Sequence, residues 1–260
     1  MSTLAVTAWA DADALADAVA ARLLTHLARV QDERGPAGVA LTGGGLGISV
    51  LASVARSPAR DAVDWAGLDI WWSDERFVPE GDPQRNDRQA FDALLDRVPI
   101  DPHRVHPVAA RGAPDIGDDV HAAASAYADE LARYEEPASY GPMPRIDVLL
   151  LGVGEDGHVA SLFPNAPTLH DTRSVVGVEG SPKPPPERVT MTLPSIQSAD
   201  EVWLVAAGAA KAPAVTLALG GAGPIAVPAV AAQGRHATAW LLDRAAASGL
   251  PPGLARYASP

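Results

Sequence analysis

The chain has 260 residues, 47% of them apolar, so it can bury a sizeable core as one large domain or two small ones. Its formal net charge of -12 disfavours binding to nucleic acids and anionic membranes, and the absence of cysteine excludes disulfides, thiolate nucleophiles and cysteine-ligated zinc. No apolar run is long enough to cross a bilayer and no signal-peptide pattern begins the chain, so we expect a soluble, cytoplasmic protein.

Short apolar runs alternate with longer amphipathic ones along the chain. After the acidic stretch "ADADAL", a helix is predicted from apolar residues at helical spacing, namely Leu15, Val19, Leu23, Leu27 and Val30. Apolar runs that end in glycine or polar residues predict strands within 37–45, 68–76, 146–154, 201–208 and 236–243. This alternation predicts an α/β protein with helices layered on a largely parallel sheet.

Proline and glycine gather at 99–117, 136–144 and 180–186, and an apolar strand follows soon after each cluster. These clusters indicate surface loops within one domain spanning residues 1–260. The tail, about 248–260, is expected to fray.

The stretch "LTGGGLGISVL" at 41–51 joins a predicted strand to a predicted helix, and its candidate binding residues are Gly43, Gly44 and Gly45. Backbone N–H groups of such a turn can cradle a phosphate. The stretch lacks the Lys-Ser/Thr of a P-loop and the glycine spacing of a dinucleotide site, which argues against ATP and NAD. A purely structural turn that needs positive φ remains an open alternative.

Cations that could bind a phosphate lie in two further stretches, the second of them just after a predicted strand. "SPKPPPERVTMTLP" at 181–194 carries Lys183 and Arg188, and "AAGAAKAPAV" at 206–215 carries Lys211. A mixture of forked guanidinium and compact ammonium groups suits a phosphomonoester. Each cation taken alone is better explained as an exposed charge in a surface salt bridge, but the joint position of the three favours a binding role.

The stretch "WWSDERFVP" at 71–79 places Asp74, Glu75 and Arg76 directly after a strand. A solvated turn is one interpretation. The other, which we favour, is that Asp74 accepts hydrogen bonds from sugar hydroxyls while Arg76 holds an adjacent anion.

"GVGEDGHVASLFP" at 152–164 delivers His158 to the same edge of the sheet. A neutral imidazole can accept a proton from water, and Asp156 could orient it. The alternative is a helix-start histidine bonded to nearby backbone. No metal site is expected, because His103 and His106 lie in a proline-bounded loop without an acidic ligand in helical register. A serine hydrolase is excluded by the lack of a G-x-S-x-G elbow.

Five motifs in order resemble those of the 6-phosphogluconolactonase family, within the larger group that includes glucosamine-6-phosphate deaminase. They are "LTGGG", "SDERFVP" with the following "RND", "GVGEDGHVASLFP", "SPKPPPERVTMTLP" and "GAAKA". The resemblance covers nearly the whole chain. It implies a three-layer α/β/α fold with a Rossmann-like sheet and hydrolysis of 6-phospho-D-glucono-1,5-lactone to 6-phosphogluconate, in the oxidative pentose phosphate pathway, without metal or cofactor.

The resemblance also implies residue roles. His158 would activate water, and four cations would hold the phosphate or stabilise charge near it, namely Arg76, Lys183, Arg188 and Lys211. The glycine loop departs from the commoner Ser-Gly-Gly-Ser-Thr-Pro pattern, since Gly45 and Leu46 replace two hydroxyl residues. Side-chain roles are therefore not carried over at those two positions.

Two other functions remain open. A glucosamine-6-phosphate deaminase resembles D-G-H-I-A-F-N-E-P after its histidine, whereas this chain has Phe163 in place of the glutamate. A non-catalytic sugar-phosphate-binding module would keep the glycine loop and the cations without needing His158. We expect a monomer or a weak homo-oligomer whose partner is a small phosphorylated lactone.

Overall fold

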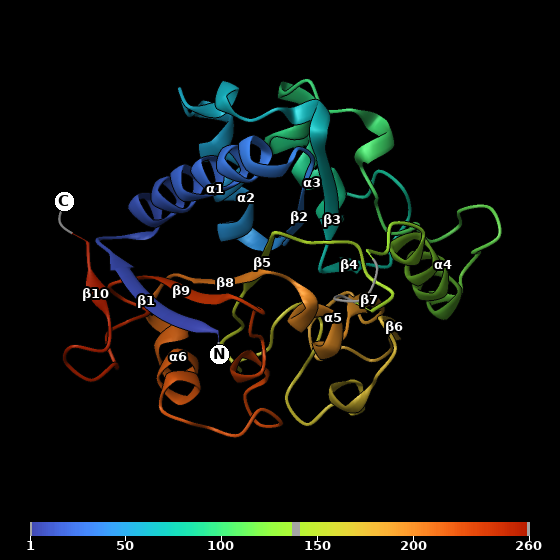
Figure 1. The fold of residues 1–260 in the computed structure, drawn as a ribbon. Coiled ribbons are helices and arrows are strands. Elements are labelled where there is room, and N and C mark those ends of the chain that lie inside the picture. The colour runs from blue at the N-terminus through green and yellow to red at the C-terminus, as the bar shows by residue number, and fades with distance from the viewer. Residues whose placement is uncertain (1, 137–140, 259–260) are drawn as a thin grey trace.

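The computed structural model describes residues 2–136 and 141–258, which fold into three layers with a sheet between two groups of helices (Figure 1). Within these residues, seven strands pair in the order β10-β1-β9-β8-β5-β2-β3, and every neighbouring pair is parallel. The strands are β1 (Thr3–Trp9), β2 (Ala37–Leu41), β3 (Leu68–Trp72), β5 (Val148–Gly152), β8 (Glu201–Ala206), β9 (Ala237–Asp243) and β10 (Arg256–Tyr257).

Successive side chains of the central strands face alternately into two apolar cores, one on each side of the main sheet. In β5, Val148 and Leu150 face one core while Leu149 and Leu151 face the other, because successive side chains of a strand point to opposite faces. Both faces are covered, so the strand is apolar at consecutive positions. This burial explains why the central strands could be predicted from short continuous apolar runs.

The helices divide between the two faces. α1, α2 and α3 cover one face, while α5 and α6 cover the other and α4 lies beside a smaller sheet (Figure 1). The helices are α1 (Ala12–Arg34), α2 (Gly44–Arg56), α3 (Asn86–Ala93), α4 (Val120–Arg133), α5 (Leu193–Ser198) and α6 (Ala212–Leu219). Short 3-10 turns are η1 (Arg60–Ala62), η2 (Trp65–Gly67), η3 (Leu95–Arg97), η4 (Pro102–Arg104), η5 (Pro167–His170), η6 (Ala209–Lys211) and η7 (Pro228–Val230).

The predicted first helix is confirmed as α1, and its ends follow from local chemistry. The Asp11 carboxylate accepts a hydrogen bond from Ala14 N at 2.9 Å, and Gly35 ends the helix at a φ of 88°. The helix presents its apolar stripe to the sheet. No helix in the described part of the chain is long and apolar enough to span a membrane.

A second sheet stands next to the carboxyl ends of the main one. Its strands β4 (Asp74–Arg76), β7 (Arg188–Met191) and β6 (Val175–Val178) pair antiparallel in that order. The predicted strand at 68–76 is thus two strands, because the chain leaves the main sheet at Ser73 and turns into β4. This turn carries the three consecutive charged residues Asp74, Glu75 and Arg76, here called the charged triplet, away from the parallel sheet.

The sequence predicted the five strands β2, β3, β5, β8 and β9, but not β1, β6, β7 or β10. Of the tail that we expected to fray, Arg256–Tyr257 form β10 on β1, and Ala258 N donates to Ala8 O at 2.9 Å. Part of the loop predicted at 136–144, residues 137–140, and the last two residues of the tail lie outside the described residues.

The neighbouring strands β2 and β5 form a switch point of the main sheet. From β2 the chain continues outward to β3 on one side, whereas β5 continues to β8 on the other. Loops that leave two such strands diverge and open a crevice beyond their carboxyl ends. The glycine loop follows β2 and the histidine loop follows β5, so both border this crevice.

Candidate functional site

A pocket of about 310 Å³ occupies the crevice at the carboxyl ends of the strands. Its lining comes from the glycine loop, β4, the start of α3, the loops after β5 and β8, and the segment leading into β7. The lining residues are Thr42, Gly43, Gly44, Asp74, Arg76, Asn86, Gly152, Val153, Gly154, His158, Ala160, Lys183, Pro184, Arg188 and Lys211. Segments far apart in sequence thus meet at one site.

The glycine loop leads into α2 as expected. Gly44 has a φ of 82°, which an L side chain rarely adopts, so the turn requires glycine there. At Gly43 a methyl group would overlap the side-chain amide of Asn86, so this glycine makes room for a neighbour. Gly45 does not line the main pocket but borders an adjacent cavity of about 230 Å³. The two cavities share Gly43, Gly44, Gly152, Val153 and Lys211.

His158 is held in a tight turn after β5. Its carbonyl accepts a hydrogen bond from Gly154 N at 2.8 Å, and its ring Nδ1 lies 2.5 Å from Asp156 Oδ1. Since an ionised carboxylate only accepts, Nδ1 carries the proton and Nε2 keeps its lone pair. The His158 ring packs 4.7 Å from the Phe163 ring, and its side chain is 16% exposed.

The surroundings keep this imidazole neutral near pH 7. Burial lowers the pKa of His158, with a further decrease from Lys183, and these outweigh the increase caused by Asp156. Burial alone would raise the pKa of Asp156, but the hydrogen bonds and charge of His158 bring it below its ordinary value. The pair is therefore a carboxylate next to a neutral histidine, which is the state that a general base needs.

Two arginines face each other across the small sheet. Arg76 of β4 is paired in register with Arg188 of β7, and both line the pocket. Like charges opposite one another destabilise a sheet unless something neutralises them. Asp74 does so only in part, since its carboxylate lies 4.0 Å from Arg188. The arrangement suits an anion bound between the two guanidinium groups.

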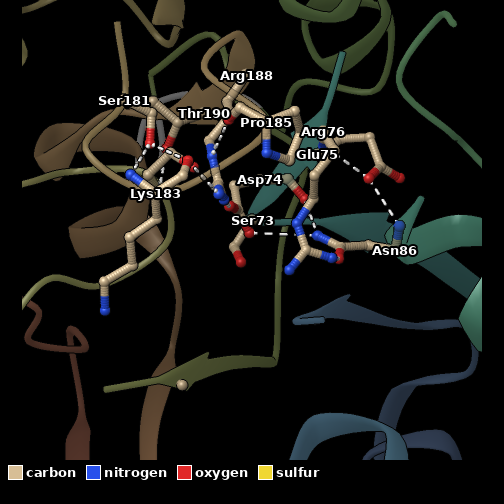
Figure 2. Close-up of polar contacts among 12 residues, drawn as sticks. Ser73, Asp74, Glu75, Arg76, Asn86, Ser181, Lys183, Pro185, Arg188 and Thr190 are labelled. Carbon is tan, nitrogen blue, oxygen red and sulfur yellow. Dashed lines mark hydrogen bonds and ion pairs between the residues drawn. The ribbon is translucent and has the colours of Figure 1, made fainter. Parts of the chain in front are cut away.

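Backbone carbonyls fix Arg188 in place. Its guanidinium donates to the carbonyl oxygens of Pro185 at 3.1 Å and of Lys183 and Pro184 at 3.0 Å (Figure 2). The proline-rich loop therefore surrounds the guanidinium of Arg188, which follows the loop in the chain. The Lys183 side chain extends away from these carbonyls, with no dashed contact at its amino group (Figure 2).

The positive charge around the pocket is largely unpaired. Within the described ranges, no carboxylate lies within 4.0 Å of a side-chain nitrogen of Arg76, Lys183 or Lys211. Burial lowers the pKa of Lys211, against the effect of Glu155. A local cluster of unneutralised cations in a chain of net charge -12 attracts small anions without attracting polyanions.

Asp74 is held as an acceptor at the pocket wall. Its Oδ2 receives a hydrogen bond from the Ser161 hydroxyl at 2.7 Å, and the Asn86 amide nitrogen lies 3.4 Å from its Oδ1. Both partners are buried, which fixes the carboxylate. A carboxylate in this position can accept from the hydroxyl groups of a sugar.

Most of the residues singled out in the sequence meet at the pocket. Gly45 lies in the adjacent cavity, and Asp156 stands behind His158 rather than on the pocket surface. Sequence reasoning missed Thr42, Asn86 and Ala160. Asn86 lies in the quoted "RND" stretch, but its role depends on the position of α3 beside β4, which no local pattern reveals.

The two histidines considered for metal binding lie elsewhere. His103 is exposed in η4, and His106 is buried against Trp71, with its Nδ1 2.9 Å from Glu130 and its Nε2 3.4 Å from Asp69. Among the described residues, no cluster of three or more His, Cys, Asp or Glu side chains is arranged to hold a metal ion.

Comparison with known proteins identifies the relatives of this site. Residues 10–240 match the model of the family described as glucosamine-6-phosphate isomerases/6-phosphogluconolactonase. The chain belongs to this family. The resemblance noted in the sequence is therefore confirmed.

Individual relatives of the chain carry the name 6-phosphogluconolactonase. The chain is 58% identical to a 6-phosphogluconolactonase of Streptomyces coelicolor over 94% of each chain, and 48% identical to that of Mycobacterium tuberculosis over 93% of this chain and 96% of the relative. A solved structure of the Trypanosoma brucei 6-phosphogluconolactonase has 26% identity and a TM-score of 0.83, covering 96% of this chain and all of the other. The expected α/β/α fold with a mostly parallel sheet is confirmed.

Proposed function

We propose that the protein hydrolyses 6-phospho-D-glucono-1,5-lactone to 6-phospho-D-gluconate, as a carboxylic ester hydrolase of the oxidative pentose phosphate pathway. The observation that carries the proposal is a neutral His158, backed by Asp156, in one pocket with four cations. The family and the identity to curated 6-phosphogluconolactonases support the same substrate.

In the proposed reaction, the cations hold the phosphate on C6 and thereby bring the lactone carbonyl C1 near His158. The Nε2 lone pair takes a proton from water while the water oxygen bonds to C1, giving a tetrahedral oxyanion. Collapse of this intermediate breaks the bond between C1 and the ring oxygen, which accepts the proton back from the imidazolium. The product is the open-chain acid, which ionises at neutral pH.

Asp156 has two tasks in this scheme. It fixes the tautomer that leaves Nε2 unprotonated, and its charge stabilises the imidazolium that forms as water is deprotonated. The developing oxyanion needs a donor, which typically contributes about 3 to 4 kcal/mol. The unpaired cations of the pocket are suited to that task as well as to phosphate binding.

The deaminase reaction is less well supported. It needs a proton-transferring group after the histidine, and the corresponding position here is Phe163, a buried ring packed on His158. Phenylalanine has no ionisable group. The absence of ammonia release from glucosamine 6-phosphate is the expected result, and its presence would reverse the ranking.

The test of the proposed function is the loss of freshly prepared lactone at controlled neutral pH, corrected for spontaneous opening. Wild-type protein should accelerate the loss, and His158→Ala should reduce kcat by about 10²- to 10⁴-fold. Near-wild-type turnover of His158→Ala would reject the assignment of the base. Tight binding of 6-phosphogluconate without any turnover would instead favour a non-catalytic binding module.

Further expectations accompany this proposal. We expect the enzyme to act in the cytoplasm, without metal or cofactor, and as a monomer or a weak homo-oligomer. Activity that survives exhaustive treatment with a chelator, and sedimentation at increasing protein concentration, test the last two points.

A further inference from the structure

Glu75 is a fully buried carboxylate in the middle of the charged triplet, and the mechanism above leaves it without a task. Because β4 is a strand, its neighbours Asp74 and Arg76 point into the pocket while Glu75 points to the other side. Burial raises the pKa of Glu75 to about 7, against the effects of Arg85 and of two backbone N–H groups. A carboxylate kept in so costly a place calls for an explanation.

The contacts of Glu75 join β4 to the beginning of α3. Its Oε1 accepts hydrogen bonds from the backbone N–H groups of Arg76 and Asn86, both at 2.7 Å, and its Oε2 accepts from that of Asp87 at 2.9 Å. Asn86 and Asp87 are the first residues of α3. Glu75 therefore supplies the acceptor for N–H groups that the helix itself cannot satisfy.

Asn86 carries the effect from α3 back to the pocket. Its Nδ2 donates to the carbonyl oxygen of Asp74 at 2.8 Å, and its Oδ1 accepts a hydrogen bond from the Nη1 group of Arg76 (Figure 2). The same Nη1 group donates to Gln84 O at 3.0 Å. Both groups that accept hydrogen bonds from Arg76 are uncharged oxygens. They orient the guanidinium, and no carboxylate neutralises its positive charge there.

Arg76 also has a donor left over. In the described part of the chain, its Nε is buried and has no hydrogen-bond partner, although Nη1 is fixed. A guanidinium that lines a cationic pocket and is held at one end by neutral acceptors is set up for an anionic ligand.

We propose that Glu75 is a positioning residue: by fixing the start of α3 it sets the Asn86 amide, which directs the Arg76 guanidinium toward the anionic substrate. The inference deepens the proposed function and rests on it, since it takes the phosphorylated lactone as that anion. Glu75 itself does not touch the ligand.

Glu75→Gln tests the relay. Glutamine keeps the shape of the side chain but places an amide donor where Glu75 accepts, so Asn86 N or Asp87 N loses its acceptor. The dissociation constant of the product, 6-phosphogluconate, measured by calorimetry, should rise by about tenfold, as expected when one charge-assisted hydrogen bond is misaligned. In an Asn86→Ala background, the same substitution should add less than about twofold, because the two residues act through one path.

Asp147→Asn is the matched control. Asp147 is also a buried carboxylate that accepts a backbone N–H, from Gly38 at 2.8 Å, and lies beside arginines, but it does not line the pocket. This variant should lower Tm and leave the dissociation constant of 6-phosphogluconate unchanged. A loss of stability without a change in binding is what a merely structural role would produce.

The outcomes separate the two proposals. If the wild-type protein binds 6-phosphogluconate and folded Glu75→Gln binds it with the same dissociation constant, the role of Glu75 is overturned. The proposed function is then unaffected. Failure of the wild-type protein to bind 6-phosphogluconate would reject the proposed substrate and the inference with it. If Glu75→Gln does not fold, Glu75→Asp replaces it; the shorter side chain reaches only one of the two α3 N–H groups, so an unchanged dissociation constant would again overturn the inference.

Discussion

Charged side chains are paired differently at the two ends of the strands of the main sheet. In this comparison the amino edge means the amino ends of the strands, and the carboxyl edge means their carboxyl ends. At the amino ends of the strands, Asp147 is ion-paired with Arg34 and lies 3.4 Å from Arg145, which in turn lies 2.8 Å from Asp200. At the carboxyl ends, Arg76 and the two lysines have no carboxylate within 4.0 Å in the described residues. Paired charge marks a structural joint, whereas unpaired charge of one sign marks a place for a ligand.

Among these predictions, Gly154→Ala should have the largest effect, because it disrupts the His158–Asp156 pair at the carboxyl edge. A methyl group at this position would overlap the His158 ring and the Asp156 carboxylate, so the pair must move apart or out of the pocket. We expect kcat/KM for lactone hydrolysis to fall by about 10²- to 10³-fold, close to the loss of the base itself. Steady-state kinetics of the folded variant measure this.

Gly223→Ala is the control, because a methyl group there meets nothing within 4 Å and the backbone does not need glycine. It should retain wild-type kinetics. Full activity of Gly154→Ala would mean that the His158 turn adapts freely and that its geometry is not required.

Removing one positive charge from each edge sharpens the contrast. Lys183→Gln should lower kcat/KM by about tenfold, since one charged contact to the substrate is lost, while Tm stays nearly unchanged. Arg34→Gln should leave kinetics unchanged and lower the free energy of unfolding by about 1 to 3 kcal/mol, because Asp147 keeps a buried charge with less compensation. Kinetics and thermal unfolding of both variants check the pair. A fall in Tm for Lys183→Gln without a kinetic effect would remove the distinction.

The protonation of His158 offers a smaller and more direct test. Burial lowers the pKa of this ring, so its NMR titration should have a midpoint below 6.5, with His158→Ala used to assign the signal. Asp156 raises the pKa, so Asp156→Asn should move the midpoint to still lower pH. A midpoint above 6.5 in the wild type would contradict the lowered pKa, and a midpoint above 7 would mean that most of the imidazole is charged at neutral pH, where it must accept a proton.

The NMR signal is preferable to a pH–rate profile here. Burial raises the pKa of Glu75 to about 7, so the ionisation of Glu75, as well as that of His158, can change the rate. The substrate phosphate also ionises near pH 6. The ring resonance of His158 reports on one group.

The sequence predicted the residues that follow parallel strands, because such strands end at a common edge. His158, which follows β5, and Lys211, which follows β8, could therefore be assigned to one site before their distances were known. Lys183 lies between β6 and β7 of the small sheet, so this rule does not explain its place in the pocket. The sequence could not predict that Gly43 makes room for Asn86 or that Glu75 turns away from its neighbours. Those features depend on where α3 docks and on the chain leaving the main sheet at Ser73, both of which are tertiary.

Ala160→Gly should have the smallest effect and probes strain at the carboxyl edge. Ala160 lines the pocket at a φ of 48°, while the other non-glycine residues that the described part of the chain has in the left-handed region, Asp115 and Asn165, are types that tolerate it. Relief of the alanine strain, about 1 to 2 kcal/mol, exceeds the entropy cost of glycine, about 0.5 to 1 kcal/mol, so Tm should rise by up to a few degrees. Asn165→Gly should show no such gain, because asparagine is not strained there. Thermal unfolding of the two variants decides the point: a lower Tm for Ala160→Gly than for Asn165→Gly would mean that the pocket wall stores no strain at this residue.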